Sequence, residues 1–235
     1  MFIQDKNFNF IEIEDKKISG ITQDKFVVAF DFDGVVTNPH KLKTQYINEL
    51  GYGITPEQCG RHVCIDILGI PIKDYERGTF RSYTESPDKL PLETDFKENF
   101  QKIRNLEKIA LFFVTSRYDD MLQHLQEYTK YHKIKIGGVV NTENKPKTAS
   151  LKSVNANIFV DDSPKKIWAI MSEDSKFCEK CSLILYRNIA NKSEENPCPS
   201  RIIETDNWNN LADRIIKEYQ KFFATFSKSS SGISR

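Results

Sequence analysis

The sequence predicts an α/β protein with a doubly wound, Rossmann-like parallel sheet and a small, mainly helical insertion. Short apolar runs without polar alternation recur along the chain, which is typical of strands covered by helices on both faces. Segments with apolar residues at helical spacing lie between these runs and indicate right-handed βαβ units. At 235 residues, the chain has room for one such core domain together with an insertion.

Five apolar runs are predicted to form the strands of the sheet. They are KFVVAF from Lys25, KIALFFVTS from Lys108, IGGVVN from Ile136, NIFVDDS from Asn157 and CSLILYR from Cys181. Apolar stripes predict helices over residues 96–106, 121–128 and 211–223. A further helix is predicted at PKKIWAI, where Trp168 is expected to pack in the core. These elements define a predicted core of residues 25–40 and 96–225.

Three segments fall outside this alternation. Residues 41–95 contain no strong apolar strand, several Gly and Pro residues and two helix-like pieces, which predicts an inserted helical cap. Residues 1–24 alternate apolar and charged positions, as expected of an N-terminal arm or hairpin. The polar segment 226–235 is predicted to be a disordered tail.

Composition narrows the class of protein. The 34 basic and 33 acidic residues leave a net charge of +1, which makes a nucleic-acid partner an unfavoured but open alternative. No apolar run has the length of a membrane span, and the N-terminus lacks the basic and apolar regions of a signal peptide. The odd number of cysteines, five, fits a reducing compartment. We therefore expect a cytoplasmic protein; its oligomeric state stays open.

Polar side chains that suit phosphoryl chemistry stand where the predicted strands end. Asp31 and Asp33 follow the first strand, and Thr115, Ser116 and Arg117 follow the second. Asp161 and Asp162 end the fourth strand, and Lys145 and Lys147 precede it near the start of a short helix. Because the carboxyl ends of parallel strands meet at one edge of a doubly wound sheet, we expect these groups to converge there.

The converging groups predict a metal-assisted reaction. Several carboxylates at one edge need a counter-charge, and Mg²⁺ prefers oxygen ligands. A carboxylate beside Mg²⁺, a hydroxyl and an ammonium form a cradle in which the carboxylate attacks a phosphoryl group. Asp31 and Asp33 are two residues apart and so share a face of the strand. The second carboxyl group is therefore placed to protonate the leaving oxygen and later to deprotonate a water.

These motifs resemble those of the haloacid dehalogenase-like (HAD) hydrolase superfamily. The first motif of that family, DxDxxT, is matched by Asp31, Asp33 and Thr37 in DFDGVVT. The second, a Thr or Ser that ends an apolar strand, is matched by Thr115 in FFVTSR. The order and setting of the motifs agree with the family over about residues 25–225, and the insertion at 41–95 lies where the family carries its cap.

The third and fourth motifs complete the resemblance. The third is a Lys at a helix start, for which Lys145 and Lys147 in NKPKTASL are both candidates, with Lys147 slightly favoured. The fourth is an acidic pair after an apolar strand, matched by Asp161 and Asp162 in FVDDSP. Family members that release halide or pump ions lack the second Asp of the first motif. The presence of Asp33 therefore favours a phosphatase or phosphotransferase.

The resemblance implies a Mg²⁺-dependent phosphatase of a small phosphorylated metabolite or nucleotide. It assigns Asp31 as the nucleophile that forms an aspartyl-phosphate and Asp33 as the general acid and base. Mg²⁺ would be held by the Asp31 carboxylate, the Asp33 backbone carbonyl and Asp162, with Asp161 behind them. The phosphoryl oxygens would be bound by Thr115 and one of the two lysines, with Ser116 and Arg117 as further candidates at the rim.

Alternatives remain for the function and for one side motif. The enzyme could act on nucleic-acid ends or a phosphoprotein, or the fold could serve as a catalytically idle binding module. The sequence CEKC, Cys178 to Cys181, has the spacing of zinc ligands, and Cys198 follows downstream. A tetrahedral zinc site needs a fourth ligand, which the neighbouring sequence lacks. These cysteines are therefore expected to be small, partly buried residues.

Overall fold

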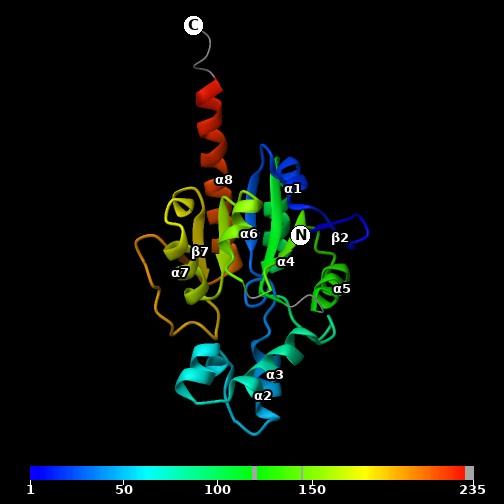
Figure 1. Cartoon of the computed structure of the whole chain (residues 1–235), viewed down its shortest axis with the longest axis vertical. Helices are drawn as coiled ribbons and strands as arrows, with labels where there is room; N and C mark the ends of the chain where they lie inside the picture. Colours follow the sequence, from blue (N-terminus) through cyan, green and yellow to red (C-terminus); the bar gives the residue numbers. More distant parts are fainter. Residues whose placement is uncertain (118–120, 144, 231–235) are drawn as a thin grey trace.

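The computed structural model describes residues 1–117, 121–143 and 145–230, which form a mixed eight-stranded sheet with helices on both faces (Figure 1). The strand order is β2-β1-β5-β4-β3-β6-β7-β8, and all neighbours from β5 to β8 are parallel. The parallel strands are β3 (Phe26–Phe30), β4 (Ile109–Thr115), β5 (Gly138–Asn141), β6 (Ile158–Asp161), β7 (Ser182–Tyr186) and β8 (Ile203–Thr205). The first five are the predicted strands, and the doubly wound class is confirmed.

The central strand β3 shows why apolar residues occupy both faces of the sheet. Its side chains at Phe26, Val28 and Phe30 pack against α4 (Phe96–Arg104), α5 (Leu122–His132) and α8 (Trp208–Ser230). Val27 and Ala29 point the other way, toward α1 (Asp15–Thr22), α6 (Thr148–Ser153) and α7 (Pro164–Glu173). Both faces are therefore covered, as the absence of polar alternation in FVVAF predicts.

The N-terminal segment extends the sheet at one edge. Strands β1 (Phe2–Gln4) and β2 (Phe10–Glu12) pair in antiparallel fashion, and β1 also pairs antiparallel with β5. The helix α1 follows before β3 and was not predicted. At the other edge, β8 was not predicted either, because three partly exposed residues give too short a pattern to recognise.

Residues 40–83 form a helical unit, which we call the helical module. It consists of α2 (His40–Asn48), η1 (Pro56–Gln58), η2 (His62–Ile67) and α3 (Ile72–Tyr83). Figure 1 shows α2 and α3 below the sheet, away from its main helical layers. A separate apolar cluster is built mainly from module residues and includes Ala190 from the loop after β7. A side chain on Gly78 would collide with Ile47 of this cluster. The segment predicted as an insertion, residues 41–95, contains all of these helices except the first residue of α2.

Two predictions about the remaining chain are wrong. Trp168 was expected in the core but is 46% exposed, because Ile167 and Ile170 on α7 fill the buried face instead. The segment 226–235 was expected to be disordered, yet α8 continues through it to Ser230, and residues 231–235 lie outside the described residues.

No described helix has the length and apolar character needed to cross a bilayer. The short helix η4 (Phe177–Glu179) precedes β7.

Glu93 is expected to make the stability of the fold depend on pH. Burial raises the pKa of its carboxyl group from 4.5 to about 7, and its Oε1 has no hydrogen-bond partner among the described residues. The folded state therefore keeps this proton at pH values where the unfolded chain has lost it. The free energy of unfolding should fall as the pH rises from about 4.5 to about 7 and then level off.

Glu93→Gln should remove this fall in the free energy of unfolding between about pH 4.5 and about pH 7. We expect the variant to exceed the wild type in free energy of unfolding by roughly 1 to 3 kcal/mol at about pH 8, and to match it at about pH 4. Urea titrations at the two pH values measure the difference. Glu107→Gln, at an exposed position, is the matched control. An equal change at both pH values would show that burial of the charge is not the cause.

Candidate active site

The sheet register brings Asp31 level with the acidic pair at the end of β6. The Asp31 backbone N–H donates to the Val160 carbonyl at 2.7 Å, so Asp31 continues the parallel pairing of β3 with β6. One carboxylate oxygen from each of Asp31, Asp161 and Asp162 lies within 4.8 Å of the others. We call these three residues the acidic triad. The first and fourth motifs therefore converge at one edge of the sheet, as the sequence predicted.

The donor set of the acidic triad fits a hard divalent cation. Carboxylate oxygens close together, two of them from side chains at most 6% exposed, are ligands that Mg²⁺ accepts. Asp161 already uses both oxygens, since Oδ2 accepts from Lys147 and Oδ1 from the Ser163 backbone N–H. Asp162 accepts from Asn188 through Oδ2. Asp162 therefore has an oxygen, Oδ1, to offer a metal directly, and Asp31 would offer one of the oxygens that Lys147 and Lys166 contact.

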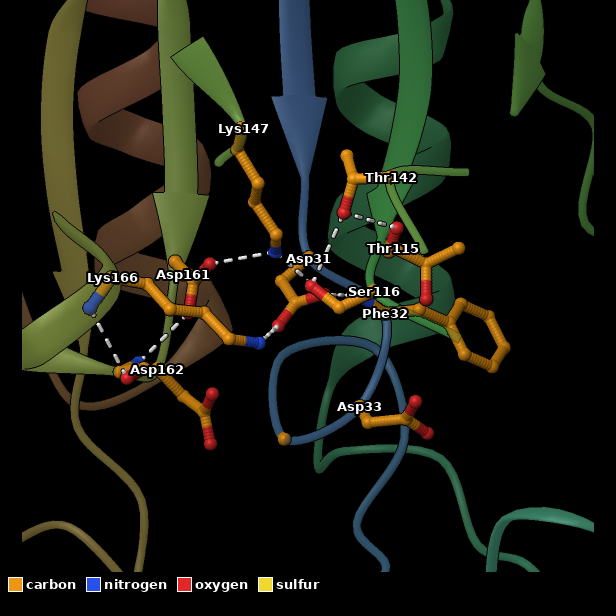
Figure 2. Close-up of polar contacts among 12 residues, drawn as sticks. Asp31, Phe32, Asp33, Thr115, Ser116, Thr142, Lys147, Asp161, Asp162 and Lys166 are labelled. Atoms are coloured by element: carbon orange, nitrogen blue, oxygen red, sulfur yellow. Dashed lines mark hydrogen bonds and ion pairs between the residues drawn. The ribbon is translucent and has the colours of Figure 1, made fainter. Parts of the chain in front are cut away.

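Two lysines flank the nucleophile candidate (Figure 2). The Lys147 ammonium lies 3.0 Å from Asp31 Oδ1 and 2.7 Å from Asp161 Oδ2, with its side chain 3% exposed. The Lys166 ammonium lies 3.5 Å from Asp31 Oδ2. Burial acts to raise the pKa of the Asp31 carboxyl group, but the charges of Lys147 and Lys166 outweigh it and leave that pKa below its ordinary value. Asp31 is therefore ionised at neutral pH.

The structure distinguishes between the two candidate lysines of the third motif. Lys147 immediately precedes α6 and reaches the acidic triad, as described above. The Lys145 side chain is 77% exposed, and its ammonium lies 3.4 Å from Glu143. Of these two lysines, Lys147 approaches the acidic groups and Lys145 does not, so Lys145 does not join the site.

Asparagines from the loop after β7 hold Asp162 in place. Asn188 Nδ2 donates to Asp162 Oδ2 at 2.9 Å and to the Gly34 carbonyl at 3.0 Å. Asn191 donates to the Asp162 carbonyl and, at 2.8 Å, to the Tyr186 carbonyl. Burial and the neighbouring carboxylates of Asp161 and Asp31 raise the pKa of Asp162 to about 7. A bound cation would relieve this crowding of negative charge.

Asp33 lies beside the acidic triad but its side chain is directed elsewhere. Its two oxygens accept from Arg117, Oδ1 from Nη2 at 2.7 Å and Oδ2 from Nε at 2.9 Å. Thr37 Oγ1 also donates to Oδ1 at 3.3 Å. The Arg117 guanidinium, predicted at the phosphate-binding rim, is therefore placed on Asp33, with 3% of its side chain exposed. Such a bidentate pair fixes the direction of the Asp33 carboxylate.

Thr115 and Ser116 end β4 next to the first motif. Thr115 is buried, its Oγ1 accepts from the Arg117 backbone N–H at 3.3 Å, and its carbonyl accepts from the Thr142 backbone N–H at 2.9 Å. The hydroxyls of Ser116 and Thr142 lie 3.4 Å apart. Figure 2 shows these hydroxyl groups on the β4 side of Asp31 and Lys147 on the other side. Hydroxyl and ammonium donors thus flank the carboxylate.

Some residues of the site are absent from the predicted set. They are Lys166, Asn188, Asn191, Thr142 and Gly34. Asn188 follows the fifth predicted strand by two residues, so the strand-end argument that found the aspartates applied to it as well. Gly34 has φ +86°, and a Cβ there would collide with the Asp162 carboxylate. Glycine lets the loop after β3 pass close to the acidic pair.

The cysteines take no part in the site. All five lie in the described residues as free thiols. Cys181 is 1% exposed and belongs to the core, while Cys178 and Cys198 pack against the same apolar cluster. This agrees with the expectation of small, partly buried residues.

Comparison with solved structures identifies the type of fold. No protein-family model matches the sequence, and no curated protein matches it. Among solved structures, the chain is similar to a haloacid dehalogenase-like protein of unknown function from Agrobacterium tumefaciens, with a TM-score of 0.57 and 11% identity over 83% of this chain and 99% of that one. It is also similar to a β-phosphoglucomutase from Clostridium difficile, with a TM-score of 0.52 and 14% identity over 85% and 99%.

Both matches span almost the whole of the solved chain and most of this one. The similarity therefore extends over most of a chain whose parallel sheet brings together the acidic triad and Lys147 at its strand ends. Sequence identity is too low for the similarity to speak of activity or substrate. The chain has the fold of the haloacid dehalogenase-like hydrolases.

Proposed function

We propose that the protein is a Mg²⁺-dependent phosphatase that hydrolyses a phosphomonoester through an aspartyl-phosphate on Asp31. The observation that carries the proposal is the position of the Asp31 carboxylate, buried between the Lys147 and Lys166 ammonium groups and beside two further carboxylates. A buried carboxylate kept ionised by cations is prepared to act as a nucleophile.

The side chains around Asp31 have complementary roles in this proposal. Asp31 attacks the phosphorus atom in line with the leaving oxygen, and one Asp31 oxygen becomes part of an acyl phosphate. Lys147, with the hydroxyls of Thr115 and Ser116, binds the phosphoryl oxygens and balances the charge that they carry. Lys147 also bridges Asp31 and Asp161 and offsets the repulsion between their carboxylates. Lys145 has no role.

Mg²⁺ would be held by Asp31 and Asp162, with Asp161 and Asn188 fixing their positions. The metal would neutralise negative charge shared between the nucleophile and the phosphoryl group. The Asp33 backbone carbonyl, at the start of the loop after β3, is the proposed third protein ligand. These are the oxygen donors that suit magnesium better than a softer metal.

Asp33 is the proposed general acid and base. Its proton would go to the leaving oxygen, and the resulting carboxylate would later take a proton from the water that attacks the acyl phosphate. In the structure Arg117 binds both Asp33 oxygens. The proton-transfer role therefore requires Asp33 to exchange at least one of these bonds when substrate arrives, and we expect Arg117 to act as its positioning residue.

The helical module is the proposed cap. It follows β3 directly and lies beyond the strand ends at which the acidic triad is located (Figure 1). A compact cap of this kind closes over a small molecule more readily than over a polymer end, and it excludes bulk water during the reaction. We therefore propose a small phosphorylated metabolite or nucleotide as the substrate.

Hydrolysis of p-nitrophenyl phosphate tests the proposed function. We expect turnover with Mg²⁺, loss of turnover to background with EDTA, and recovery when Mg²⁺ is returned in excess. Activity that persists unchanged in EDTA would contradict the metal requirement. Absence of turnover with all divalent metals and a broad panel of phosphomonoesters would favour a catalytically idle binding module.

Lys166→Met is expected to strengthen metal binding. The Lys166 ammonium contacts Asp31 with a side chain that is 43% exposed, so it competes with a divalent cation for the same negative charge. We expect the Kd for Mn²⁺, measured by calorimetry without substrate, to fall roughly 3- to 10-fold. Lys165→Met, one residue away and exposed, should leave that Kd unchanged. Weaker Mn²⁺ binding by the Lys166 variant would show that this lysine supports the site instead.

A further inference from the structure

Lys43 on α2 is a buried ammonium group that, among the described residues, has no carboxylate within ion-pair distance; Glu194 interacts with it only at longer range. The residue is 5% exposed, and its ammonium donates a hydrogen bond to the Tyr75 hydroxyl at 3.3 Å. Its ammonium also lies 5.4 Å from the centre of the Tyr75 ring. In the described parts of the chain, no carboxylate forms an ion pair with it. An ammonium has three N–H donors, so hydrogen-bonding capacity remains unused.

The groups around Lys43 connect it to the candidate active site. The Tyr83 hydroxyl lies within electrostatic reach of Lys43, Asp33 and Asp162. The Arg117 guanidinium, which holds Asp33, lies 5.2 Å from the centre of the Tyr83 ring. Lys43 therefore belongs to the helical module and lies on the side of it that is near the proposed catalytic groups.

His40 adds a second buried polar group with an unmet hydrogen bond. It begins α2, is 2% exposed, and its Nε2 has no partner among the described residues. Its Nδ1 lies 3.5 Å from Cys59 Sγ. Two polar groups one helical turn apart are thus buried at this boundary with bonding capacity to spare, although nearly all buried polar groups in proteins are satisfied.

An unpaired charge in this position is unfavourable for the fold alone. Burying an ammonium without a carboxylate lowers stability, and a well-packed apolar side chain of similar length would avoid the penalty. Groups that are costly to the fold and unsatisfied at a site boundary are typical of binding sites, because a ligand supplies the missing partner. A negatively charged group would satisfy Lys43 directly.

We propose that Lys43 binds a second anionic group of the substrate, a carboxylate or a phosphate, distant from the phosphoryl group that reacts at Asp31. The inference rests on the proposed function for the position of the reacting phosphate. It makes the substrate class a phosphorylated compound with two negatively charged ends. Tyr83, which is near both Lys43 and Asp33, links the proposed second site to the catalytic groups.

Two matched pairs of compounds test this. Glycerol 3-phosphate and 3-phosphoglycerate differ by an added carboxylate, and fructose 6-phosphate and fructose 1,6-bisphosphate differ by an added phosphate. We expect the wild type to prefer the doubly anionic member of at least one pair in kcat/KM. Lys43→Met should reduce that preference about 30- to 100-fold. Lys41→Met, on the exposed side of the same helix, should preserve it.

A binding measurement separates this inference from the proposed function. Calorimetry of the same four compounds with the Mg²⁺-loaded protein reports the preference even if no compound is hydrolysed. A protein that hydrolyses p-nitrophenyl phosphate but binds both members of each pair equally would overturn the second anionic site alone. A preference in binding without hydrolysis would overturn the phosphatase and leave the site standing.

Stability measurements distinguish a binding role from a structural one. Removing an unpaired buried charge should raise the urea midpoint of Lys43→Met above that of the wild type. A variant that is less stable and loses affinity for all four compounds by one common factor would show that Lys43 only supports the packing of α2 against α3. That result would overturn the proposal.

Discussion

Asp31→Asn is expected to lower kcat for p-nitrophenyl phosphate by about 10³-fold or more, because the amide cannot form the acyl phosphate. The substitution keeps the shape of the side chain and its level with Val160 on β6. It also leaves Lys147 bound to Asp161 at 2.7 Å. The loss should therefore appear in kcat, with the folded state retained, and rapid-quench assays with circular dichroism as a fold check measure both.

Asp88→Asn is the matched control for this substitution, since Asp88 is exposed in the segment that follows α3. It should retain wild-type kcat. Mass spectrometry after acid quench should find one phosphoryl group on the peptide that contains Asp31 in the wild type and none in the Asp31→Asn variant. If the variant kept its activity, another group would have to be the nucleophile.

Asp33→Asn is expected to lower kcat for an alkyl phosphate by roughly 10² to 10⁴-fold, because the poor leaving group then departs without a proton. p-Nitrophenolate leaves without protonation, so transfer to Asp31 should remain fast with p-nitrophenyl phosphate. Hydrolysis of the acyl phosphate still needs a base and should become slow. We expect a burst of nitrophenolate close to one equivalent per protein, followed by slow turnover.

The burst distinguishes proton transfer from a purely structural role. Asp33 holds Arg117 through two hydrogen bonds, so its replacement also disturbs Arg117. If the disturbance of Arg117 were the whole effect, both substrates would lose activity equally and the burst would be absent. Asp66→Asn, with its side chain 64% exposed, should behave as the wild type with both substrates.

The sequence predicted the core of the fold because β3, β4, β5, β6 and β7 are short runs buried on both faces, a pattern that few other structures produce. It also predicted which side chains would meet. Asp31, Thr115 and Asp161 each end a strand, and parallel neighbours end at the same edge whatever the details of packing. Convergence of the motifs follows from topology alone.

The sequence did not predict which way the long side chains of the site point. Lys145 and Lys147 differ by two positions, and only the start of α6 decides that Lys147 reaches Asp31 while Lys145 turns to Glu143. Arg117 follows Thr115 closely, yet its guanidinium pairs with Asp33. A long side chain can reach several acceptors of similar charge, so its partner depends on distances across the fold that no local pattern contains.

Sequence patterns were enough to predict the doubly wound sheet and the edge where the acidic residues collect. Only the folded structure shows how charge is distributed around this edge. Two lysines contact Asp31, two asparagines hold Asp162, and Lys43 is buried at the boundary of the helical module without a carboxylate in ion-pair distance. The two kinds of property differ in how much of the chain they depend on. Burial pattern and strand ends are local properties, whereas the balance of charge in a buried site depends on groups more than a hundred residues apart that only the folded chain brings together.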